Sequence, residues 1–151
     1  KFFELKKKTS ISIIGHSLIK LPFSQPMYNM TALGYGDWFL QGLENYVIDG
    51  VLASILKVTV KQDVLNINVP TFIIKNEKYK KIPFKFIVKA YGNMGASHIP
   101  YLTTSLLNNR FLYTGGFGVD VLSYYDFVAK FEYSFNQLGE KGLFLHLRKE
   151  F

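Results

Sequence analysis

The chain has 151 residues with a formal net charge of +7, and 17% of its residues are aromatic. A hydrophobic fraction of 48% with only 19% charged residues excludes a disordered tail, and the lack of Cys excludes a disulfide scaffold, a thiolate metal site and a Cys nucleophile. No apolar run reaches the roughly 18 residues that a transmembrane helix needs. The positive charge favours an anionic partner in general, such as nucleic acid or lipid headgroups. Because the first residue is Lys1 and not Met, we expect a mature product or a fragment.

An alternation of large apolar and polar side chains is the dominant pattern of the chain, and it predicts β-strands. In chain order, the first strand carries Gly15 as a candidate kink, the second alternates less cleanly, and the third begins near Pro83, where a missing N–H is tolerated. No segment has a helical period. Each strand has about the 9–11 residues that a tilted strand needs to cross a bilayer. The six predicted strands are 9–21, 50–62, 82–92, 111–122, 126–136 and 142–151.

The alternation separates aromatic from charged side chains in the second half of the chain. In the strand 126–136, Phe131 and Tyr133 share one face, whereas Lys130 and Glu132 share the other. An aromatic face is typical of a lipid-facing barrel wall, and mixed charges are typical of a polar barrel interior. A soluble β-sandwich also alternates, but Val, Ile and Leu would dominate its core face, so we favour the barrel. The residues predicted to line the interior are Asp120, Lys130, Glu132, His146, Arg148 and Glu150.

The connections between these strands differ in length. Tight turns are predicted at 123–126 and 138–141, whereas 22–49 and 93–110 are long and rich in Gly, Asn, Pro and Ser. The connection 63–81 is also long. We interpret its basic end as a solvated turn in preference to a contact with anionic lipid or a periplasmic partner.

The end of the chain is an alternating strand that finishes on Phe151, and it resembles the C-terminal β-signal of bacterial outer-membrane barrels. Such an edge strand can be captured by strand addition. Two further regions carry a wider likeness. The first comprises 32–37 (ALGYGD), 40–44 (LQGLE) and 46–50 (YVIDG); the second comprises 113–120 (YTGGFGVD), 123–126 (SYYD), 132–136 (EYSFN) and 142–146 (GLFLH). On these segments the chain resembles the C-terminal barrel half of the BamA/TamA outer-membrane assembly superfamily, in the TamA-like branch of Bacteroidetes.

The resemblance implies that 22–49 is an extracellular loop that folds back into the barrel. Its tip, which carries an Arg-Gly-aromatic motif in the family, corresponds to Leu40, Gln41, Gly42 and Leu43. Gln41 stands in place of the Arg. It lacks the positive charge and the paired N–H donors with which an Arg side chain would hold the tip against carboxylates of the inner wall. We therefore expect Gln41→Arg to strengthen docking of the loop. The Gly-rich run 115–118 is interpreted as a smooth wall that another backbone or the loop approaches closely.

The implied fold is an all-β, antiparallel transmembrane β-barrel, of which residues 1–151 would form about the last six strands of sixteen. The alternative is a small closed eight-stranded barrel with further strands from 1–6 and 64–74. The implied location is the bacterial outer membrane of a Gram-negative cell, with the C-terminus periplasmic. The predicted seam strand is defined by Gly142, Leu143, Leu145, Leu147 and Phe151.

The predicted function is non-enzymatic assembly and insertion of other barrel proteins. The rival is a structural or binding barrel of an envelope or secretion complex, or a small pore, without insertase activity. Expected partners are outer-membrane lipids and the rest of the barrel or a completing chain, with periplasmic or lipoprotein partners and client barrels beyond them. A nucleic-acid-binding domain is disfavoured, because it would mix exposed rings with lysines on one face.

Enzyme chemistry is not expected, and no cofactor is predicted. His16, His98 and His146 lie far apart in the sequence on different elements, so the sequence predicts no metal site. The sequence shows no paired carboxylates for general acid–base catalysis. Nothing in it positions Ser97 and His98 as a nucleophile and its general base.

Overall fold

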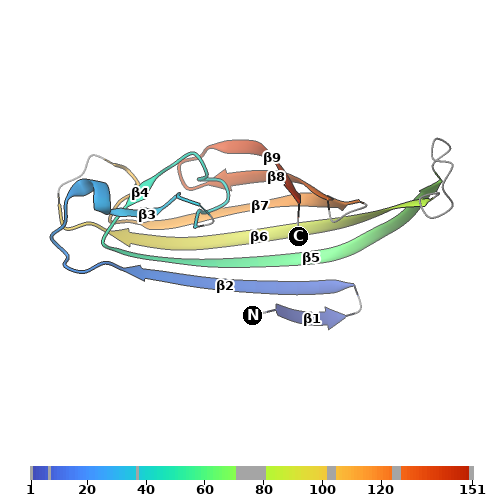
Figure 1. Ribbon diagram of the computed structural model, residues 1–151, viewed down its shortest axis with the longest axis horizontal. Helices are drawn as coiled ribbons and strands as arrows, with labels where there is room; N and C mark the ends of the chain where they lie inside the picture. Colours follow the sequence, from blue (N-terminus) through green and yellow to red (C-terminus); the bar gives the residue numbers. More distant parts are fainter. Residues whose placement is uncertain are drawn as a thin grey trace.

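The computed structural model describes residues 2–6, 8–36, 38–70, 81–101, 105–123 and 127–149. The prediction of an all-β, antiparallel fold is confirmed: the strands form one seven-stranded and one two-stranded antiparallel sheet (Figure 1). Within these residues, no helix is long and apolar enough to span a membrane. The large sheet has the order β1 (Phe2–Lys6), β2 (Thr9–Ile19), β5 (Leu52–Pro70), β6 (Lys81–His98), β7 (Phe111–Leu122), β8 (Phe127–Asn136) and β9 (Lys141–Lys149).

Two predicted strands are much longer than their sequence patterns indicated. The strand predicted at 50–62 continues as β5 to Pro70, because a bulge between Asp63 and Leu65 shifts the register by one residue and breaks the alternation there. Residues 64–70 therefore extend β5 and are not a separate strand of a small barrel. The strand predicted at 82–92 continues to His98 through a Gly-containing stretch that resembled a loop. Residues 71–80 lie outside the described residues.

The loop predicted to fold inward, residues 22–49 (the infolded loop), covers one face of the large sheet in its described part. It contains the short 3-10 helix η1 (Met27–Asn29) and the short strands β3 (Thr31–Leu33) and β4 (Ile48–Asp49), which the sequence did not predict. Figure 1 shows β3 and β4 beside the large sheet. The buried apolar side chains of the loop and sheet form one cluster: Leu33, Leu40, Leu43, Ile48, Ala53, Ile55, Leu107 and Leu112.

The opposite face of the sheet carries the large apolar side chains and leaves them exposed. Along β8, exposed Phe127, Phe131, Tyr133 and Phe135 alternate with side chains that are buried or half-buried. Within the described residues no second sheet covers these rings, in contrast to the core face of a β-sandwich. The exposed outward side chains of β7 and β9 are Phe111, Tyr113, Phe117, Leu143, Leu145 and Leu147.

The large sheet is open in the described part of the chain. β1 and β9 stand at its two ends, and each pairs with one neighbour only. A small closed barrel would need two further strands, from 1–6 and 64–74. In the described part of the chain the first of them is present as β1, the second is not a separate strand, and the sheet does not close. Unpaired edge backbone is costly wherever water cannot reach it.

Candidate functional site: the inner wall and the loop tip

A buried lysine on the covered face of the sheet joins two carboxylates from neighbouring strands. The ammonium of Lys89 on β6 forms ion pairs with Asp120 on β7 and Glu132 on β8. All three side chains are at most 3% exposed. Lys61 on β5 adds a longer ion pair, 3.5 Å from Nζ to the Asp120 Oδ2. The pairing satisfies charges that would otherwise be strongly destabilising inside the protein.

The glycines of β7 create the space that this arrangement needs. Gly118 stands between Lys89 and Glu132 in the register of the sheet, so the lysine side chain must cross β7 at that position. A Cβ on Gly118 would lie 3.2 Å from the Lys89 Cε and 2.3 Å from the Phe131 carbonyl oxygen. At Gly116 the Tyr91 side chain crosses β7 in the same way and hydrogen-bonds Ser134 on β8. At both glycines a β8 backbone carbonyl comes closest to the added Cβ, as the expected approach of another backbone requires, and a β6 side chain fills the space beside it.

This packing predicts the effect of adding one methyl group to β7. Gly118→Ala should lower the free energy of unfolding by about 1–3 kcal/mol, as overpacking usually does. Gly92→Ala on β6 is the matched control, because no atom lies within 4 Å of its added Cβ, and it should change stability by less than about 0.5 kcal/mol. Equilibrium denaturant unfolding measures both variants. Equal effects at the two positions would contradict the close packing of β8 and Lys89 against Gly118.

The tip of the infolded loop lies directly on this wall. The Gln41 Nε2 is 3.3 and 3.4 Å from the two Glu132 oxygens, and its Oε1 accepts a 3.4 Å hydrogen bond from Asn93. Gly42 has φ +92° and a Cβ there would lie 3.0 Å from the Ser134 Cβ, so Gly both adopts this backbone and permits the approach. The Asn136 amide donates to the Gly42 carbonyl at 3.0 Å. Leu40 and Leu43, the first and last residues of the tip, are buried in the apolar cluster.

A second polar group joins the loop to β8 and β9. The His146 Nε2 lies 3.3 Å from a Glu44 oxygen and 3.8 Å from a Glu132 oxygen. Burial raises the pKa of the Glu44 carboxyl, although the nearby His146 acts in the opposite direction. The carboxylate of Glu44 therefore costs stability at neutral pH, and a neighbouring cation would reduce that cost.

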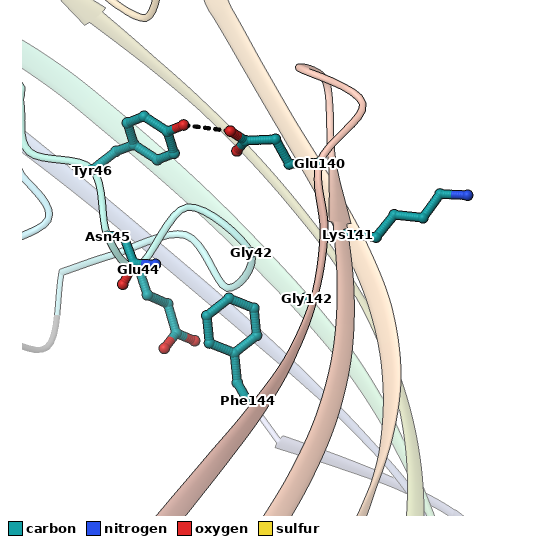
Figure 2. A pocket seen from close by; sticks show the side chains of 8 residues that line it. All are labelled: Gly42, Glu44, Asn45, Tyr46, Glu140, Lys141, Gly142 and Phe144. Atoms are coloured by element: carbon teal, nitrogen blue, oxygen red, sulfur yellow. Dashed lines mark hydrogen bonds between the residues drawn. The ribbon is translucent and has the colours of Figure 1, made fainter.

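A cleft of about 330 Å³ lies between the loop and the start of β9. Figure 2 shows Glu44 and Phe144 facing this space, with Tyr46 and Glu140 joined at its rim. The Tyr46 hydroxyl donates a 2.6 Å hydrogen bond to Glu140, which also accepts one from Asn136. These bonds lower the pKa of the Glu140 carboxyl, chiefly through Tyr46, and raise the pKa of the Tyr46 hydroxyl.

The direction of these pKa shifts predicts a pH dependence at the rim. Because the folded-state pKa of Glu140 is lowered, its contribution to stability is present above the ordinary value of 4.5 and is lost as the pH falls through the folded value. Acidification below pH 4.5 should therefore release this part of the loop, which cleavage by pepsin within the infolded loop would report. Glu140→Gln should reduce the acid-dependent change. An unchanged acid response in Tyr46→Phe and Glu140→Gln alike would contradict the assignment.

The other residues predicted for the site fall into three groups. Lys130 is half-buried and lies opposite His146 in the sheet register. Gly142, Leu143, Leu145 and Leu147 lie on the edge strand β9, with the three leucines exposed. The side chain of Arg148, and Glu150 and Phe151 as a whole, lie outside the described residues.

Sequence reasoning missed Lys89, Tyr91 and Glu44. The first two shared the polar face of a predicted strand with Lys85, and the glycines of β7 signalled the space that their side chains need. Glu44 had no such signal, since its neighbours His146 and Glu132 are about ninety to a hundred residues away in the sequence.

Comparisons of the chain with protein-family models, curated proteins and solved structures find no match.

Proposed function

We propose that this chain forms the C-terminal part of an outer-membrane β-barrel that helps to insert and assemble other barrel proteins without catalysing a chemical reaction. One observation carries the proposal: large apolar side chains are exposed on one face of the sheet, while the ionic groups are buried on the other. Phe131 is 45% exposed, whereas its neighbour in the chain, Glu132, is 2% exposed. Water would oppose this arrangement and hydrocarbon would favour it.

The open sheet supports the idea that further strands complete the barrel. In lipid, each unpaired backbone group of β1 and β9 would cost several kcal/mol. The remainder of the same polypeptide or a completing chain would pair with these edges. The exposed leucines of β9 would then continue the lipid-facing surface beside the seam.

Assembly activity would use the edge strand and the loop together. A seam that opens at β9 exposes backbone donors and acceptors onto which an incoming strand can add. The infolded loop braces β7 and β8 through Gly42 and Gln41, and it would keep the wall in shape when the seam opens.

A structural or binding barrel without insertase activity is the second candidate. The hydrogen bonds of Gln41 favour it, because they are long, at 3.3 to 3.4 Å, and Gln41 itself carries no charge. Depleting the protein from the cell distinguishes the two. The insertase proposal expects other barrel proteins to disappear from the outer membrane; their unchanged levels, with only one complex lost, would support the structural role.

A further inference from the structure

The cluster of Glu44, Glu132 and His146 has the geometry of a metal site. The infolded loop, β8 and β9 supply one residue each, and a donor atom from each lies within 4.8 Å of the other two. The imidazole Nε2 is 3.3 Å from the nearer Glu44 oxygen and 3.8 Å from the nearer Glu132 oxygen. Ligands of a tetrahedral zinc ion, at about 2.0–2.2 Å from the metal, stand roughly 3.4 Å apart. Small side-chain movements would therefore bring all three donors to bonding distance.

Both carboxylates have an oxygen available for such an ion. The Glu44 Oε1 is buried and, apart from the 3.3 Å approach of the His146 Nε2, has no hydrogen-bond partner among the described residues. Lys89 binds the Glu132 Oε1, whereas the Oε2 lies 3.3 Å from the Gln41 Nε2 and 3.8 Å from the His146 Nε2. Glu132 can therefore keep its ion pair and still offer one oxygen.

An ion could reach the cluster from the cleft between the loop and β9. Glu44 lines that cleft, and the His146 side chain is 35% exposed. The imidazole favours zinc and its first-row neighbours over magnesium or calcium, which prefer oxygen ligands alone.

We propose that Glu44, Glu132 and His146 bind a divalent transition-metal cation of the zinc class, which ties the infolded loop to β8 and β9. This differs from the sequence-based expectation that the chain has no metal ligand. It requires the docked loop but neither a membrane nor assembly activity, so it is independent of the proposed function. A bound ion would add a strong link to a loop tip that is otherwise held by hydrogen bonds and apolar packing.

The test is calorimetric titration of zinc chloride into the purified full-length protein after removal of metals with a chelator. We expect one zinc ion per chain, and a dissociation constant at least about tenfold weaker in His146→Gln and in Glu44→Gln. His98→Gln is the matched control, since His98 is exposed on β6 and should leave the affinity unchanged.

X-ray absorption of the loaded protein gives a second readout that does not depend on folding of a variant. It should show one imidazole and otherwise oxygen ligands around zinc. No binding, or binding that His146→Gln and Glu44→Gln leave unchanged, would overturn the proposal and leave His146 as an ion-pair partner only. A spectrum that shows several imidazole ligands around the zinc would overturn it as well.

Discussion

Replacing Lys89 by Met is expected to lower the free energy of unfolding by about 3–5 kcal/mol, because it removes the ammonium that the buried Asp120 and Glu132 share and leaves Asp120 with the longer ion pair to Lys61. Met has nearly the shape of the lysine stem, so the change tests charge more than packing. Urea unfolding of the full-length protein in phospholipid vesicles measures the effect.

The matched control for this prediction is Lys85→Met on the same strand and the same face. Lys85 pairs with Asp63 at 2.6 Å, but the two side chains are 40% and 28% exposed, and an exposed pair of this kind contributes about 0–1 kcal/mol. If the two lysine variants lose equal stability, the bridging role assigned to Lys89 is wrong.

The same ion pairs change what Gln41→Arg should do. From the sequence, the added charge was expected to strengthen docking of the loop. In the structure Lys89 already neutralises Glu132, so an arginine at the tip would place a second cation beside the first. We now expect little gain from Gln41→Arg alone and a partial rescue when it is combined with Lys89→Met, which a double-mutant cycle would measure.

The second large effect is expected on the outward face. Phe131→Arg should destabilise the vesicle-inserted protein by about 2–4 kcal/mol if the middle of β8 lies near the bilayer centre. Phe23→Arg in the infolded loop is the control, since Phe23 and Phe131 are 47% and 45% exposed in this chain. In water the two substitutions would be nearly equivalent, so equal and small effects would contradict a lipid-facing wall.

The local pattern of the sequence was sufficient for most of the sheet. The alternation predicted β7 and β8 to within one residue, and it assigned Phe131 and Glu132 to opposite faces. It failed in β5, where the bulge after Asp63 reverses the alternation, and it missed the last residues of β6 beyond Gly92. Both failures arise because pairing with a neighbouring strand holds backbone that looks irregular by itself.

The candidate site was less accessible to sequence reasoning, because it depends on contacts across the sheet. The position of the loop tip over Glu132 could be expected only from the family resemblance. To predict that the Lys89 side chain crosses β7 at Gly118, the register of β6, β7 and β8 must be known together. The contact between Glu44 and His146 requires the loop to be docked, which no local pattern encodes.

Fluorescence quenching by phospholipids with brominated acyl chains tests the central claim most directly. Trp38 is the single tryptophan of the chain, so in a Trp38→Phe background one probe can be placed by Phe131→Trp on the outward face and another by Phe144→Trp on the inward face. We predict strong quenching of the probe at position 131 and weak quenching at position 144. Equal quenching at both positions, or none at position 131, would contradict a wall that presents its rings to lipid and its charges to a polar interior.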